Sequence, residues 1–270
     1  MRAKFAREVA SLGLPAVPRE RQLVTDADLA SLPIAAQRMM RFSGTVGRFR
    51  DASFCAHYDA QFRLSPDAAF QPVEIWQYDT SMDVARVFHM RMNLGGVVPT
   101  YIRDLYAHGG GHMLGKVLDV LPIVDDETEK VTVGELVTYV NDAVLFAPSM
   151  LLGPAVSWAH VDDATFEVML TDRHTTVSAR VFLDAHGAVT DFMTTDRFGT
   201  DPANPKAGLV RTEWRTPVDG WTLVDNRPRP VGARAVWRFP SGDFTYASFD
   251  LRAGEIAYHG SPGELPGAAT

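Results

Sequence analysis

The clearest hydrophobic pattern in the chain predicts an α-helix over residues 132–147. Apolar side chains recur there at the spacing of one helical face, at Leu136, Val140, Ala143 and Val144. Thr132 and Glu135 have the spacing of a capping box, in which each side chain binds a free backbone N–H of the first turn. Pro148 ends the predicted helix because its ring clashes with the preceding turn.

Alternation of polar and apolar residues predicts strands over most of the remaining chain. It is strict over residues 54–64, where the even positions are apolar and the odd positions are Cys55 or polar. Further strands are predicted at residues 73–78, 86–94, 100–107, 156–158, 166–170, 175–183, 189–197, 210–216, 221–225, 233–239, 244–251 and 255–258. About ten to twelve short strands, separated by turn signals, indicate an antiparallel sandwich or barrel. We therefore predict a mainly β (α+β) fold, with a curved sheet or incomplete barrel wrapped around the helix.

The N-terminal part of the chain has a different pattern. Phe5, Val9 and Leu12 have the spacing of a short amphipathic helix, and residues 26–42 form a second helical region with Pro33 in its first turn. No composition break marks a second domain. We predict a lightly held arm at 1–24, one β-barrel-like domain at 25–259 and a flexible tail at 260–270.

Composition narrows the range of partners. The chain has 270 residues and a formal net charge of −7, so nucleic acid is an unlikely general partner. Cys55 is the single cysteine, which excludes an internal disulfide and suits a reducing compartment. No apolar stretch has the length of a signal peptide core or a membrane span, so a cytoplasmic location without a membrane span is expected.

Several segments resemble a bacterial family, a domain of unknown function common in actinobacteria. The resemblance is carried by residues 111–118 (GHMLGKVL), 122–125 (PIVD) and 134–139 (GELVTY), with Trp158 downstream, and it covers about residues 30–258. It implies a curved antiparallel sheet packed on a helix, similar to lipoprotein-carrier half-barrels, and it implies no activity. Residues 145–148 (LFAP) are less aromatic than the family pattern, which points to a reshaped cavity.

The common catalytic and cofactor motifs are absent, so no cofactor and no metal is predicted. The sequence has no phosphate-binding loop, no G-x-S-x-G elbow, no H-E-x-x-H and no cysteine pair for zinc. Cys55 with His57 could form a nucleophile and base, but an inert thiol is the commoner case. His108 and His112 could share a metal, but three glycines separate them and no third ligand is evident.

Candidates for acid–base chemistry lie on the polar faces of the early strands. His57 and His89 alternate with apolar residues, near Asp59, Arg63 and Arg91. If these faces point inward, a histidine beside a carboxylate and an arginine could perform general acid–base catalysis. If they point outward, which the apolar opposite faces favour, they form a solvated surface. Tyr101 and Glu135 are further candidate catalytic donors, although Glu135 is more often a cap in such a pattern.

Aromatic and methionine side chains are the candidate ligand-binding residues. Such side chains can line an apolar cavity and still offer a polar or adaptable contact, although ordinary core packing explains them as well. They are Trp76, Tyr78, Met90, Met92, Tyr106, Tyr139 and Trp158.

Three functions fit this pattern. The first is binding of a hydrophobic small molecule, lipid-like or polyketide-like, in the cavity of the curved sheet. The second is a cofactor-free cyclase, isomerase or hydrolase that acts on such a molecule in the same cavity, since fixing the shape of a flexible chain promotes cyclisation. The third is a protein-interaction module, and a homodimer is conceivable.

Overall fold

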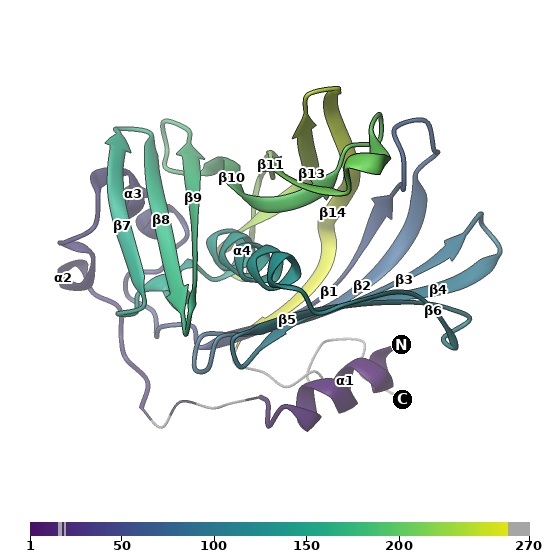
Figure 1. Ribbon diagram of the computed structural model, residues 1–270. Coiled ribbons are helices and arrows are strands. Elements are labelled where there is room, and N and C mark those ends of the chain that lie inside the picture. The colour runs from purple at the N-terminus through teal and green to yellow at the C-terminus, as the bar shows by residue number, and fades with distance from the viewer. Residues whose placement is uncertain (16–17, 19, 259–270) are drawn as a thin grey trace.

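The computed structural model describes residues 1–15, 18 and 20–258 (Figure 1). The tail predicted at 260–270 lies outside the described residues. The described chain forms one sheet of fourteen strands, in which all pairs are antiparallel. The sheet curls around a central helix, and its two ends, β6 and β7, stay apart in the strand order. The predicted fold class, an incomplete antiparallel barrel around a helix, is confirmed.

The strand order follows the chain in two runs that meet at the C-terminal strand. The first run is β6 (Leu121–Asp126), β5 (Gly110–Val117), β4 (Val98–Ala107), β3 (Ala85–Leu94), β2 (Gln71–Thr80) and β1 (Ser53–Phe62). β1 then pairs with β14 (Gly242–Tyr258). The second run continues through β13 (Arg227–Phe239), β11 (Leu209–Arg215), β10 (Val189–Thr200), β9 (Thr175–Leu183), β8 (Thr165–Asp172) and β7 (Val156–Asp162), while β12 (Val218–Val224) pairs with β13.

The alternation in the sequence decides which side chains face the interior. Even positions of β1, such as Phe54 and Tyr58, join the main core with the central helix, and the in-register residues Ile75 and Met90 lie on the same face. Odd positions such as Cys55 lie on the convex face. A one-residue shift would exchange the two faces, so the pattern itself fixes the register.

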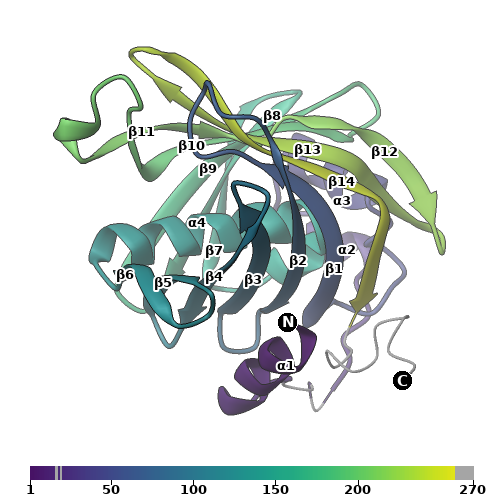
Figure 2. The same ribbon diagram turned by 90° about the vertical axis from the view of Figure 1, so that its right-hand side faces the viewer.

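The central helix, α4 (Glu129–Phe146), runs through the hollow of the sheet (Figure 2). It begins three residues before the predicted start, and Thr128 rather than Thr132 is its N-cap residue. The predicted capping box is wrong: the Thr132 hydroxyl accepts a 2.9 Å hydrogen bond from the Gly111 N–H, and Glu135 is buried inside the sheet. The predicted stop is confirmed, since Pro148 begins a separate 3-10 turn, η1 (Pro148–Leu151).

The N-terminal helix, α1 (Arg2–Ser11), packs on the convex face of the sheet (Figure 2). Phe5 and Val9 are fully buried, and the Phe5 ring lies 6.0 Å from the Trp76 ring, centre to centre. Burial of a phenylalanine side chain stabilises the contact by roughly 1.5–3 kcal/mol. The expected lightly held arm is therefore a docked helix over residues 2–11.

Two short helices, α2 (Asp26–Leu29) and α3 (Ile34–Phe42), replace the single helical region predicted at 26–42. Pro33 separates them and is the N-cap residue of α3, which packs against β7 and β8. The long loop after β10 holds a 3-10 turn, η2 (Pro205–Ala207). Within the described residues, no helix combines the length and apolar character that a membrane crossing requires.

Candidate functional site

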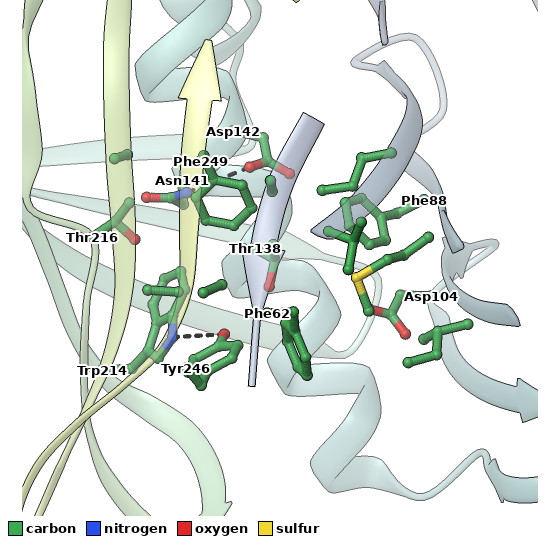
Figure 3. Close-up of a pocket in the computed structure, with 18 of the residues that line it drawn as sticks. Phe62, Phe88, Asp104, Thr138, Asn141, Asp142, Trp214, Thr216, Tyr246 and Phe249 are labelled. Carbon is green, nitrogen blue, oxygen red and sulfur yellow. Dashed lines mark hydrogen bonds between the residues drawn. The ribbon is translucent and has the colours of Figure 1, made fainter. Parts of the chain in front are cut away.

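A cavity of about 360 Å³ lies between α4 and the concave face of the sheet (Figure 3). Its walls come from both runs of strands, and their side chains are mostly apolar. Small-molecule sites typically have volumes of roughly 300–1,000 Å³, so the cavity is large enough for a small ligand. The aromatic residues in the wall are Tyr58, Phe62, Phe88, Phe146, Phe198, Trp214, Trp237, Phe244, Tyr246 and Phe249.

A buried arginine ties α4 to the sheet beside this cavity. Arg86 of β3 is in phase with the apolar Phe88, so its side chain points inward. Its Nε donates a 2.8 Å hydrogen bond to Asp142, and its Nη1 donates a 2.9 Å hydrogen bond to Glu135. Asp142 also accepts a 2.7 Å hydrogen bond from the Gln77 side chain. One cation thus faces two carboxyl groups of the helix in a site with little access to water.

Burial leaves these carboxyl groups reluctant to ionise. Loss of hydration raises the pKa of Glu135 to about 8, and the nearby Asp104 adds to the effect while Arg86 opposes it. Burial also raises the pKa of Asp104 and of Asp142. Asp142 accepts additional hydrogen bonds that favour its charged form, whereas burial raises the pKa of the neighbouring Asp79 well above its usual range, so a proton is favoured on Glu135 and Asp79 rather than on Asp142.

Three polar atoms in the cavity wall have no hydrogen-bond partner within the described part of the chain. They are Oδ1 of Asp104, Oδ1 of Asn141 and Oγ1 of Thr216. Figure 3 shows Asn141 and Thr216 on one side of the cavity and Asp104 on the other. A buried polar atom without a partner costs about 1–3 kcal/mol.

A guanidinium group lies against the aromatic part of the wall. Arg197 of β10 is 4.4 Å from the centre of the Trp214 ring and 5.4 Å from that of Trp237. Trp214 donates a 3.1 Å hydrogen bond to the Tyr246 hydroxyl, and the Tyr246 ring stacks on Trp237. Arg197 makes no hydrogen bond and no ion pair with another described residue, so its charge is available to the cavity.

Of the predicted ligand-binding residues, Met90 lines the cavity. Met92, Tyr106 and Tyr139 are buried in the surrounding core instead, where the Tyr106 hydroxyl donates a 2.7 Å hydrogen bond to Asp172. The candidate catalytic residue Glu135 does not line the cavity but binds Arg86, which does.

The other predicted residues of the early strands lie on the convex face, away from the cavity. His57 stacks on Trp76, with ring centres 4.0 Å apart, and Tyr78 joins the apolar cluster under α1. His89 is fully buried between Tyr101 and Glu8 of α1. His57, Trp76, Tyr78, His89 and Tyr101 therefore lie on the outward face, which the strand pattern favoured for the two histidines, and do not line the cavity.

Trp158 lines a separate hollow of about 230 Å³ near α2, together with Asp28 and Arg50. This hollow has a smaller and more polar wall than the cavity around α4. Trp158 therefore does not contribute to the main cavity.

The remaining reactive side chains have structural partners. Burial raises the pKa of Cys55 to about 12, so the thiolate that a nucleophile requires is scarce at neutral pH. His112 lies 2.8 Å from Asp125 and 3.1 Å from Glu127, and His108 lies 3.3 Å from Asp83. Among the residues described, no group of three or more histidine, cysteine, aspartate or glutamate side chains could hold a metal ion.

The sequence interpretation missed Arg86, Asp104 and Arg197 as residues of the cavity. For Arg86 and Asp104 a signal exists, because each charged residue occupies a position in phase with apolar neighbours, Phe88 for Arg86 and Ile102 for Asp104. Arg197 sits at the end of a predicted strand and has no comparable signal.

A model of a family of unknown function, DUF6544, matches residues 22–249. The chain belongs to this family. The predicted resemblance to a domain of unknown function is thereby confirmed, while the actinobacterial origin stays a prediction. No curated protein matches the DUF6544 chain.

Two solved structures resemble this DUF6544 member at low sequence identity. A LolA superfamily protein from Nitrosomonas europaea is 12% identical, with a TM-score of 0.41 over 82% of this chain and 91% of that chain. A DUF1329 family protein from Desulfovibrio piger is 10% identical, with a TM-score of 0.43 over 88% of this chain and 94% of that chain. The likeness concerns the fold.

Proposed function

We propose that this protein binds a hydrophobic small molecule, lipid-like or polyketide-like, in the cavity between α4 and the sheet. The observation that supports this proposal most strongly is a cavity of about 360 Å³ whose wall is mainly aromatic and aliphatic, with a few polar side chains. Apolar surface drives the entry of a greasy molecule, and a few convergent polar atoms fix its orientation. The cytoplasmic location and the homodimer predicted from the sequence stay predictions.

Titration with the apolar fluorescent probe N-phenylnaphthylamine tests this function. Ala235→Phe adds a ring at a buried position of the cavity wall and should weaken probe binding at least tenfold, because the added side chain occupies the ligand volume. Ala159→Phe, at an exposed position of β7, is the matched control and should bind the probe as the wild type does. Equal binding by all three proteins would rule out the cavity as the binding site.

A second candidate function is cofactor-free acid–base catalysis on the bound molecule, as in a cyclase, isomerase or hydrolase. Asp104 favours it, since its carboxyl group lines the cavity, has a raised pKa and keeps one oxygen without a partner. A protonated carboxyl group in such a site can donate a proton to a reacting molecule. In this version Asp104 takes the acid–base role that the sequence analysis assigned to His57 and His89.

Substitution of Asp104 separates the two functions. Asp104→Asn keeps the shape of the side chain and removes the proton that it can transfer. If the protein only binds its ligand, probe affinity changes little and turnover is absent in both forms. If it is a catalyst, the wild type converts the bound molecule and the variant does so at least a hundredfold more slowly.

A further inference from the structure

We propose that the cavity takes an amphiphile with a single carboxylate head group, held by Arg197, whose hydrocarbon chain lies along the apolar wall. This inference rests on the proposed function and adds the chemical class of the ligand. It starts from the distribution of charge around the cavity, where three arginines contribute to the wall: Arg63, Arg86 and Arg197.

The three arginines differ in whether their charge is matched. Arg86 is hydrogen-bonded to the carboxyl groups of Glu135 and Asp142. Arg63 donates to the backbone oxygens of Thr245 and Pro66 and forms no ion pair with a described carboxylate. Arg197 has neither kind of partner among the described residues. Arg63 and Arg197 thus form no ion pair with a carboxylate of the described residues, and the acidic groups that Arg197 influences are the buried Asp104 and Glu135.

The unmatched arginines flank one strip of aromatic side chains. Arg63 lies 5.5 Å from the centre of the Phe244 ring, and Arg197 lies 5.4 Å from that of Trp237. Phe244 and Trp237 are direct neighbours across the β13–β14 pair. Contact with a ring leaves the N–H edge of a guanidinium group free while restricting its motion, so less entropy is lost when an anion binds.

The geometry of the donor favours a carboxylate. A guanidinium group presents two parallel N–H bonds that match the two oxygens of a carboxylate. Burial raises the pKa of Glu135 and of Asp104, which disfavours the negative charges that would offset Arg197, although Arg197 itself lowers both values. Removing a doubly charged phosphate from water costs far more than removing a monoanion, so a monoanion fits this apolar cavity better.

Calorimetric titration with three ligands that share one alkyl chain tests the head group. The ligands are dodecanoate, dodecanol and dodecyl phosphate, each below its micelle concentration at pH 7.5. The wild type should bind dodecanoate about tenfold more tightly than dodecanol, as one added charge-assisted hydrogen bond would produce. The preference should shrink as salt is added, because salt screens the arginine.

Variants of Arg197 locate the preference. Arg197→Met should weaken dodecanoate binding about tenfold and leave dodecanol binding unchanged. The affinity of Arg197→Lys for dodecanoate should lie between those of the wild type and Arg197→Met. Arg91→Met is the control, since Arg91 lies on the convex face and pairs with Glu74. Circular dichroism and thermal unfolding establish that each variant folds. If Arg197→Met does not fold, the salt dependence of dodecanoate binding by the wild type still tests whether a positive charge holds the head group.

The outcomes separate this inference from the proposed function. Equal affinity of the wild type for dodecanoate and dodecanol, or an equal effect of Arg197→Met on both, would overturn the carboxylate site and leave hydrophobic binding intact. Tighter binding of dodecyl phosphate than of dodecanoate would overturn the assignment of the head group. Failure of all three ligands to bind would refute the proposed function itself.

Discussion

Arg86 of β3 and Glu135 of α4 are joined by a 2.9 Å hydrogen bond inside the half-barrel, where both side chains are almost fully buried. The same guanidinium group binds Asp142, two helical turns further on. The helix is therefore held to the sheet at two points by one cation. Because Arg86 and Asp142 both line the cavity, this contact also sets the distance between the helix and the wall.

Replacement of Arg86 should destabilise the fold strongly. Arg86→Met leaves the buried carboxyl groups of Glu135 and Asp142 without their cation, and loss of one partner of a buried ion pair costs about 3–5 kcal/mol. Arg91→Met is the control, and its free energy of unfolding should change by less than about 1 kcal/mol because Arg91 forms an exposed pair with Glu74. Urea unfolding at pH 7.5 measures both, and similar values for the two variants would contradict this role of Arg86.

Glu135 should make the stability of the wild type fall with rising pH. The folded protein retains the proton of Glu135 up to about pH 8, whereas the unfolded chain releases it near the ordinary carboxyl value of 4.5. Between these values the folded state binds more protons, so the free energy of unfolding decreases as pH rises. The contribution is fully present below pH 4.5 and is lost as pH passes the folded-state value.

Glu135→Gln removes this titration and keeps an oxygen that can accept the hydrogen bond from Arg86. The stability of the variant should fall less steeply between pH 5 and 8, by up to about 1.4 kcal/mol per pH unit. Asp79, Asp104 and Asp142 titrate in both proteins, so the difference between the two curves reports the removal of Glu135 together with its effect on these neighbours. Parallel curves over this interval would show that Glu135 is ionised in the folded state.

Gly111 should tolerate no side chain. A Cβ at this position would lie 2.5 Å from the Thr132 Cα, so β5 and α4 would have to separate. Gly111→Ala should cost about 1–3 kcal/mol, as expected for overpacking of a core contact. The adjacent Gly110→Ala is the matched control, because its nearest neighbour would be 3.8 Å away. Thermal unfolding compares them, and equal melting temperatures would argue against the close approach of strand and helix.

The docking of α1 should depend on Phe5. Phe5→Ala removes a fully buried ring and leaves a cavity next to Trp76, at a cost of about 3–5 kcal/mol. Hydrogen exchange measured by mass spectrometry should show faster exchange over residues 2–11 and unchanged exchange in α4. Arg7→Ala, at an exposed position of the same helix, should leave the exchange unchanged. Unaltered protection of α1 in Phe5→Ala would mean that other contacts hold the helix.

The sequence predicted the curved sheet because period-two alternation directly reports which side of a strand is buried. The alternation could not show which face of the sheet is concave, because both faces are buried in this region. α1 covers the convex face, so His89 on that face is as buried as Met90 on the concave face. Amphipathic spacing likewise located α4 but did not reveal that its polar residues Asn141 and Asp142 are buried. A helix surrounded by its own sheet has no solvated side, and its polar residues meet buried partners such as Arg86.

The cavity itself depends on contacts between segments far apart in the sequence. Arg86, Asp142 and Arg197 come from β3, α4 and β10, and no spacing rule relates them. Charged residues in phase with an apolar strand face are the local sign of such a site. Arg86 and Asp104 both show this sign.

Photoaffinity labelling tests the central claim, that the concave face holds an apolar guest, most directly. A dodecanoate analogue with a diazirine in its alkyl chain is bound, illuminated and mapped by peptide mass spectrometry. We expect the label on α4, β13 and β14. Ala235→Phe should lose this labelling, whereas Ala159→Phe should be labelled as the wild type is. Labelling confined to exposed apolar turns, such as those around Val97 and Val120, would contradict the account.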